Sequence, residues 1–311
     1  MYDSVARLSP IPDRQVAQLA IRQTVPRTVV VSNATDDFLR ESFRSVIKLL
    51  NFPPSLSSIG IKLNLCDYRL GSSGATSRIE VVRAMVNVLR EFYPGCKVTL
   101  IEHHSSGTDA RDLFRMLGFE SLAVETGCAL LSLADTKWRE VEVPASRALR
   151  SIKVSEAFDE FDFWINHPKL KVHGKTHISI ALKNLFGCLE PKWKVPFHDH
   201  LDEVIVDINK VLRPHVSIVD GTISLLNWGP TYGVPVRTNV LIGGTDPVSV
   251  DAECARLIGI HPRMIRHLRL ARKDGLGKIT TEHARLKLNC LPGLNLDWAR
   301  HLIVRYGGIT G

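Results

Sequence analysis

Short apolar runs alternate along this chain with longer amphipathic stretches, and this order constrains the fold more than any other feature. Amphipathic residues 79–92, IEVVRAMVNVLREF, repeat their apolar positions every three or four residues, which is typical of a helix. Strands that alternate with helices form parallel sheets with crossover connections. The sequence therefore predicts an α/β fold with a mostly parallel sheet, as one unit or as two lobes around a central cleft. The candidate strands are 28–31, 59–65, 97–102, 129–133, 161–166, 215–220 and 238–243.

Several helix ends are marked by the residues that favour them. Ser77 and Glu80 fit a capping box before the helix at 79–92. Another helix is expected to begin near Asp109 and to end at Gly118, and a short one to end near Gly127. Further helices are expected at 201–212, 246–259 and 264–275.

The domain organisation follows from these elements. We expect an N-terminal extension at residues 1–24, an α/β domain at 25–280 and a C-terminal extension at 281–311 that packs on the domain. The segment WREVEVP alternates with period two, which predicts a β excursion or a lobe boundary near 135–155.

Composition limits the partners. The 311 residues carry a formal net charge of +8, which favours an anionic substrate, nucleic acid or an anionic membrane surface. No apolar run approaches the roughly 18 residues of a membrane span, so no membrane contact and a cytoplasmic location are expected. The absence of a nucleic-acid-binding signature argues against nucleic acid. A homodimer is left open. Widely scattered cysteines predict mostly buried free thiols, at Cys66, Cys96, Cys128, Cys188, Cys254 and Cys290.

Residues 163–192 are the candidate functional segment, because cations stand there among residues that otherwise predict a buried segment. A buried cation needs an anionic partner or a lowered pKa. The cationic or titratable residues are Lys169, Lys171, His173, Lys175, His177, Lys183 and Lys192.

Pro168 favours an extended chain around it, so Lys169, Lys171 and His173 are expected to alternate onto one face. Crowded cations lower the pKa of lysine, which suits it to acid-base chemistry near neutral pH. The alternative is an exposed basic edge strand.

Other polar residues are expected near this face. Asn166 ends the preceding strand, and Lys183 and Asn184 are left to face a pocket by their apolar neighbours, although Asn184 fits a structural role as well. Lys62 and Asn64 share one face of an apolar strand and together can bind an anion, although a lysine that reaches solvent is the plainer interpretation.

Two loops can direct backbone N–H groups at an anion. GSSGATS, residues 71–77, precedes a helix, and Ser72, Ser73, Gly74 and Thr76 are its candidate binding residues. The loop HHSSGTD, residues 103–109, has the same form, but an ordinary turn without a bound anion is the favoured interpretation of it. Gly174-Lys175-Thr176 resembles the end of a P-loop, but lysine stands at position 169 where a glycine is needed, which excludes that interpretation.

Acidic residues complete the candidate set. Asp220 ends a strand and is expected to balance the lysine charge or to orient a catalytic lysine, whereas Asp246 is first of all an N-cap before Pro247. Residues 227–235, NWGPTYGVP, are expected to form a lid or a pocket wall. A metal site is the alternative interpretation of the histidines, with His173, His177, His198 and His200 as ligands, but Gly174 and β-branched neighbours weaken the helix that it needs.

The motifs, in their order along the chain, resemble the proteins of domain-of-unknown-function family 362. The resemblance spans about residues 59–277 and is carried by IKLNL, NHPKLKVHGKTHISIALKNLFG, SIVDGTI with GPTYGVPV, NVLIGGTDPVSVDAECARLIGI and IRHLRLARKDGLG. Many relatives carry an added ferredoxin module, and this chain lacks its cysteines, so it is expected to be a stand-alone member without an iron-sulfur role. Leu63 stands where the family pattern usually has proline. The strand, loop and helix near residues 71–92 also resemble the amino-terminal half of nickel-pincer lactate racemases, which implies a similar fold and transfers no residue.

These features together predict an enzyme that uses no cofactor or metal and acts on a small anionic carboxylate or phosphate by proton transfer, as an isomerase, lyase, cyclase or decarboxylase. Residues expected to hold the anion are Lys62, Asn64, Ser72, Ser73, Gly74, Thr76, Asn166, Lys169 and Asn184. Residues expected to take part in catalysis are Lys171, His173, Lys183 and Asp220. The alternatives are a metal-dependent enzyme and a non-catalytic protein that binds anions or nucleic acid.

Overall fold

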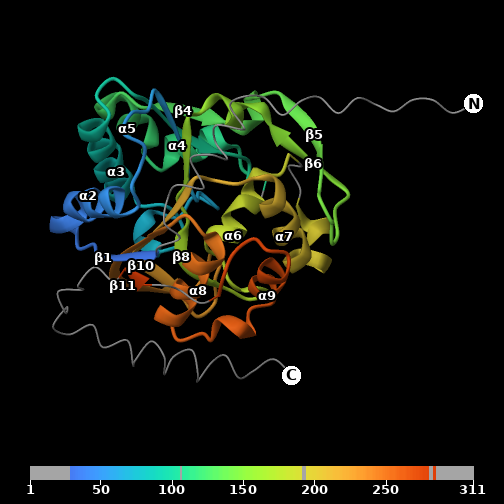
Figure 1. Ribbon diagram of the computed structural model, residues 1–311. Coiled ribbons are helices and arrows are strands. Elements are labelled where there is room, and N and C mark those ends of the chain that lie inside the picture. Colours follow the sequence, from blue (N-terminus) through green and yellow to red (C-terminus); the bar gives the residue numbers. More distant parts are fainter. Residues whose placement is uncertain (1–28, 106, 191–193, 280–282, 285–311) are drawn as a thin grey trace, which may run out of the picture.

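A ten-stranded sheet forms the centre of the computed structural model, which describes residues 29–105, 107–190, 194–279 and 283–284 (Figure 1). Five neighbouring strands of this sheet are parallel, which confirms the predicted α/β class with a mostly parallel sheet. In spatial order they are β10 (Val216–Leu226), β7 (Phe163–Asn166), β2 (Ser58–Lys62), β3 (Lys97–Glu102) and β4 (Ala129–Ser132).

The other side of the sheet departs from the parallel pattern. β11 (Val234–Gly244) lies antiparallel between β10 and β1 (Val29–Asn33), and β12 (His283–Ala284) pairs with β1 at the edge. The sequence predicted shorter strands here. The connection between β10 and β11 is too short for the crossover that parallel neighbours require, so the two strands form an antiparallel ribbon instead. β8 (Lys169–His173) pairs with β10 and with β9 (His177–Ile178).

Helices cover both faces of the sheet and bury two apolar cores (Figure 1). One face carries α2 (Leu39–Leu49), α3 (Ile79–Phe92), α4 (Ala110–Met116) and α5 (Phe119–Thr126). The opposite face carries α6 (Ala181–Asn184), α7 (Leu201–Val211), α8 (Pro247–Leu257) and α9 (Arg266–Lys273). Short 3-10 helices lie at Asp36–Phe38, Gly71–Ser73, Leu133–Asp135, Glu156–Glu160, Leu185–Cys188, Val195–His200 and Pro262–Met264.

Most of the predicted helix ends are confirmed. Asp109 and Asp246 cap α4 and α8 by accepting backbone N–H groups, and Gly118 and Gly127 adopt the left-handed conformation that ends a helix. The prediction of a capping box formed by Ser77 and Glu80 at the start of α3 is wrong.

The helix α3 begins after Arg78, with no side-chain cap, because the Ser77 hydroxyl accepts the N–H of Asn64 at 3.0 Å instead. Ser77 therefore joins α3 to the chain after β2, beside the site.

A separate two-stranded sheet occupies the position of the predicted β excursion. It consists of β5 (Trp138–Glu142) and β6 (Ser151–Ser155), which are antiparallel. Ile152 and Val154 of this hairpin pack into the core shared with α6 and α7. Of the two predicted extensions, residues 1–24 lie outside the described residues, as does 281–311 apart from β12. In the described ranges, no helix is both long and apolar enough to span a bilayer.

Candidate functional site

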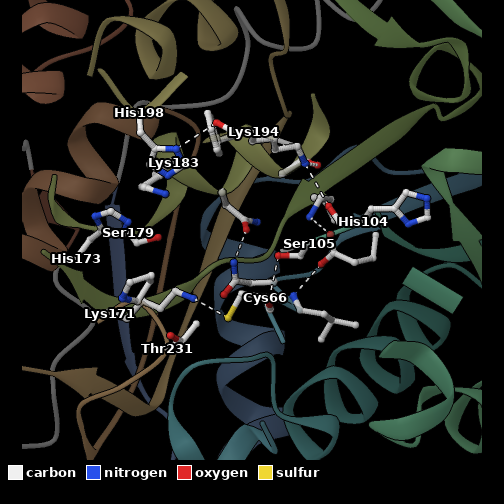
Figure 2. A pocket seen from close by; sticks show the side chains of 18 of the residues that line it. Cys66, His104, Ser105, Lys171, His173, Ser179, Lys183, Lys194, His198 and Thr231 are labelled. Carbon is white, nitrogen blue, oxygen red and sulfur yellow. Dashed lines mark hydrogen bonds and ion pairs between the residues drawn. The ribbon is translucent and has the colours of Figure 1, made fainter. Parts of the chain in front are cut away.

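A cavity of about 310 Å³ opens at the carboxyl ends of β2 and β3 (Figure 2). This is the edge at which open α/β sheets bind ligands. β8 and the segment around α6 form further parts of the wall, and Pro230 and Thr231 contribute from the loop between β10 and β11. The loop thus contributes to the pocket wall, but through Pro230 and Thr231 rather than through the expected Trp228, Tyr232 and turn glycines. Trp228 and Tyr232 of the same loop are exposed.

Lys171 reaches the cavity from β8 and is almost fully buried. Its Nζ donates a hydrogen bond to the Ala75 carbonyl at 2.8 Å and lies 3.5 Å from the Cys66 Sγ (Figure 2). Leu170 and Val172 pack into the core on the other side of the strand, as the predicted alternation requires.

Lys194 reaches the cavity from the residue before the 3-10 helix Val195–His200. Its Nζ donates to the carbonyls of Gly187 at 3.0 Å and His104 at 3.3 Å. Carbonyl groups satisfy hydrogen bonds of an ammonium group but do not neutralise its charge. Burial lowers the pKa of Lys194 to about 8.

Lys183 is held at the cavity by α6, whose start is fixed by Asp251. The two carboxylate oxygens of Asp251 accept the N–H groups of Ala181 at 2.7 Å and Leu182 at 3.1 Å. Within the described residues the half-buried Lys183 ammonium has no hydrogen bond or ion pair; it lies 5.1 Å from the ring centroid of Phe186. Burial, and then repulsion by other cations, lowers the pKa of Lys183 to about 8.

The fourth lysine of the cavity, Lys62, is neutralised. Its Nζ forms an ion pair with Glu102 at 2.6 Å, and both side chains are almost fully buried. Glu102 also accepts the backbone N–H groups of His103 at 2.9 Å and Leu65 at 2.7 Å. Among the lining residues that the structure describes, Glu102 is the one carboxylate. With histidines counted as neutral, the four lysines and this carboxylate leave the cavity with a charge of +3.

His173 lines the cavity as a neutral imidazole. Its Nδ1 lies 3.2 Å from the N–H of Lys175 and 3.3 Å from that of Thr176, so this atom acts as the acceptor. Burial, together with the positive charge of Lys183 and Lys171, lowers the pKa of His173 to about 2. The proton of the neutral ring therefore stands on Nε2, where it can only be donated to a hydrogen bond.

Three asparagines form a chain from the core to the cavity. Asn64 donates to Asn184 at 2.7 Å, and Asn184 donates to Asn166 at 2.7 Å. Asn64 and Asn184 line the cavity, whereas Asn166 is fully buried behind them. The predicted residues Lys62, Asn64, Lys171, His173, Lys183 and Asn184 are thus brought together around one cavity.

Lys169 and Asp220 lie outside this cavity. They form an ion pair at 2.8 Å with both side chains fully buried. The prediction that Asp220 balances a lysine charge is confirmed, and its partner is Lys169. Because this pair is closed to the cavity, neither residue is placed to contact a ligand there.

The GSSGATS loop departs from its predicted role as well. Ser72, Ser73, Gly74 and Thr76 do not line the cavity. The Arg78 N–H at the start of α3 lies 3.5 Å from the Asp220 carboxylate, so a carboxylate of the protein itself occupies the place expected for a substrate anion. The loop also directs the Ala75 carbonyl, rather than N–H groups, at Lys171.

Several polar lining residues were not among the candidates: Cys66, Glu102, His104, Ser105, Ser179 and Lys194. Glu102 ends a predicted strand, and His104 and Ser105 lie in the loop HHSSGTD, so a rule that takes every strand end as a candidate would have found them. No local pattern distinguishes Lys194. Lys192, whose role was left open, lies outside the described residues.

The histidines do not form the predicted alternative metal site in the residues that the structure describes. His173 and His177 face each other across the β8–β9 pairing rather than on one helix, and His177 is exposed. His198 lines the cavity, and His200 is exposed. No group of three or more His, Cys, Asp or Glu side chains within the described ranges could hold a metal ion.

Cys66 provides a chemical probe of the cavity. It is the partly exposed one of the five described cysteines, all of which are free thiols, and the other four are buried. In a Cys290→Ser background, iodoacetamide should therefore alkylate Cys66 first, and sulfate should slow the reaction by occupying the cavity. Peptide mass spectrometry with and without sulfate measures this. Equal labelling of a buried thiol such as Cys188 would contradict the described burial.

The family profile described as "Domain of unknown function (DUF362)" matches residues 59–256 of this chain. The chain belongs to this family. The matched region of this DUF362 chain extends from β2 to α8 and contains every lining residue named above.

Two individual proteins are also similar. A thylakoid-associated protein, sll1697, of Synechocystis sp. strain PCC 6803 is 24% identical over 255 residues, which make up 78% of this chain and 77% of that protein. The lactate racemase apoprotein from Thermoanaerobacterium thermosaccharolyticum matches with a TM-score of 0.47 and 9% identity. That match covers 81% of this chain and 60% of the racemase chain.

Proposed function

We propose that this chain is an enzyme that binds a small anionic metabolite in the cavity and transfers a proton within it. The observation that carries the proposal is the uncompensated charge: Lys171, Lys183 and Lys194 line one cavity whose described carboxylate is already paired with Lys62. Buried cations without counter-charges are costly, and a bound carboxylate or phosphate removes that cost. A volume of about 310 Å³ suits a small metabolite.

The proposal gives the lysines different roles. Lys171 and Lys194 are fixed by carbonyl groups, which suits them to hold the anion in one position. Lys183 has no such anchor within the described chain, and its pKa of about 8 lets it exchange a proton near neutral pH. We assign Lys183 as the acid-base residue. His173 donates a hydrogen bond from Nε2 to the ligand.

Proton transfer by Lys183 next to a carbonyl or a leaving group results in an isomerisation, elimination, cyclisation or decarboxylation. In an isomerisation, cyclisation or elimination, a neutral Lys183 amine removes a proton from carbon or oxygen, and the ammonium returns it to the product or to the leaving group. In a decarboxylation, CO₂ leaves, its bonding electrons stay on the remaining carbon, and the Lys183 ammonium protonates that carbon. The neighbouring cations stabilise the negative charge that develops on the substrate. The proposed chemistry requires no organic cofactor or metal.

The enclosed position of the lysines favours a small ligand over nucleic acid. Lys171 is 1% exposed, and a phosphate of a nucleic-acid backbone needs cations at the surface. The Lys171 ammonium is instead reached through the cavity. Tight binding of duplex DNA at physiological salt would reverse this preference.

Solvent exchange tests the proposal because it detects proton transfer whatever the product is. The protein is incubated in D₂O with a panel of 2-oxo acids, dicarboxylates and sugar phosphates, and mass spectrometry measures deuterium in the recovered compounds. We expect catalysed exchange in at least one compound, with Lys194→Met weakening its binding. Lys48→Met, at an exposed lysine of α2, is the matched control. Absence of exchange across the panel, together with no binding by calorimetry, would overturn the proposal.

Anion affinity should fall as the pH rises through about 8. Lys183 and Lys194 are protonated below their lowered pKa of about 8 and lose charge above it. Succinate stays doubly ionised over this range, so its affinity should fall about tenfold or more between pH 7 and pH 9.5. The unliganded protein should gain stability as the pH rises from about 8 towards the ordinary lysine pKa of 10.5, because the unfolded chain then binds more protons. Calorimetry and thermal unfolding measure the two trends. A constant affinity would contradict them.

A further inference from the structure

We propose that the ligand of this cavity carries a hydrogen-bond donor, a hydroxyl or amino group, beside two negative charges, and that the donor binds the Asn64 Oδ1. The inference rests on the anion site proposed above and names the substrate class within it. A hydroxy-dicarboxylate or the phosphate ester of a polyol has this chemistry.

The orientation of the asparagine chain is fixed from the core outward. Asn166 Nδ2 donates to the Ala181 carbonyl at 2.9 Å, and a carbonyl can only accept. Asn166 Oδ1 is therefore turned to Asn184, whose Nδ2 donates to it at 2.7 Å and also lies 3.2 Å from the Leu63 carbonyl. Two backbone carbonyls thus set the orientation of both buried amides.

This orientation decides what Asn64 presents. Asn184 Oδ1 is left to accept, so Asn64 must turn its Nδ2 towards it, at 2.7 Å. The Asn64 Oδ1 then has to face the other way, because the amide cannot flip without breaking the whole chain. Within the described residues this oxygen is buried and has no hydrogen-bond partner.

An unpaired buried acceptor is costly to the protein, and a suitable donor on the ligand removes that cost. A carboxylate or a fully ionised phosphate group has only acceptors, and it would be repelled by this oxygen. The lysines of the same cavity attract the anionic groups, while Asn64 selects for an O–H or N–H next to them. The net charge of +3 in the described lining favours a ligand with at least two negative charges.

Matched pairs of compounds test the inference. Malate differs from succinate by one hydroxyl group, and glycerol 3-phosphate differs from propyl phosphate by two. Isothermal titration calorimetry at pH 7 should show that the hydroxylated member of at least one pair binds about tenfold tighter or more. In Asn64→Leu the preference should fall to about twofold or less, with the affinity for the other member retained. Asn64→Ala repeats the test with a smaller side chain, and thermal unfolding checks that both variants fold.

The outcomes separate the inference from the function beneath it. Equal binding of both members of each pair, or a preference that survives in both Asn64 variants, overturns the inference and leaves the anion site standing. If none of the four compounds binds, and if sulfate gives no protection of Cys66, the anion site itself fails.

Discussion

Asp220→Ala should destabilise the protein by about 3–5 kcal/mol, the cost of leaving a buried charge without its partner. The Lys169 and Asp220 side chains are fully buried, 2.8 Å apart. Asp220 also accepts the Thr222 hydroxyl at 2.6 Å and the Thr222 N–H at 2.9 Å. Urea unfolding at pH 7 measures the loss. A loss below about 1 kcal/mol would mean that the Lys169 ammonium finds another partner or solvent.

A double variant separates the charge from the packing. Lys169→Met/Asp220→Ala removes both charges, so it should recover at least half of the stability that Asp220→Ala loses. Equal instability of the single and double variants would show that the Thr222 contacts, rather than the ion pair, carry the effect.

The Lys169–Asp220 ion pair should also make the folding stability depend on pH in the acidic range. Burial alone would raise the pKa of Asp220, but the attraction of Lys169 outweighs it and holds this pKa below its ordinary value of 3.8. The ionised pair therefore stabilises the fold above that ordinary value, and the contribution is lost as the pH falls through the lower folded pKa.

Lys183→Met should reduce solvent exchange by about 10²–10⁴-fold, the usual contribution of a general acid-base residue. Anion binding should change far less, because Lys171 and Lys194 remain. The melting temperature at pH 7 should stay constant or rise, since methionine replaces a half-buried ammonium that has no hydrogen-bond partner in the described chain.

Lys171→Met provides the contrasting case for Lys183→Met. It removes a cation that the Ala75 carbonyl fixes in place, so we expect weaker anion binding with a smaller loss of exchange at saturating substrate. Mass spectrometry of exchange and calorimetry of binding, on the same compound, compare the two variants. If Lys183→Met retains wild-type exchange, Lys183 is not the acid-base residue.

Local patterns were sufficient for much of the fold. The candidate strand at 97–102 has the same limits as β3, and the apolar periodicity of 79–92 defines α3. Predictions that depended on a partner distant in sequence were less complete. The antiparallel ribbon of β10 and β11 extends beyond both predicted strands, because its length depends on cross-strand pairing rather than on either segment alone.

The same distinction between local patterns and distant partners applies to the cationic or titratable residues of the segment 163–192. The sequence by itself determined that Lys169, Lys171 and His173 alternate with apolar residues in an extended chain, because the side-chain period of a strand is a local property. Only the tertiary structure decided that Lys169 is neutralised by Asp220, 51 residues away, while Lys171 meets the Ala75 carbonyl. Lys169 and Lys171 lie two residues apart on the same strand, yet the first is paired with a carboxylate and the second is not. The charge that remains in the cavity is fixed by which distant groups the fold brings to each lysine, and no local pattern encodes that choice.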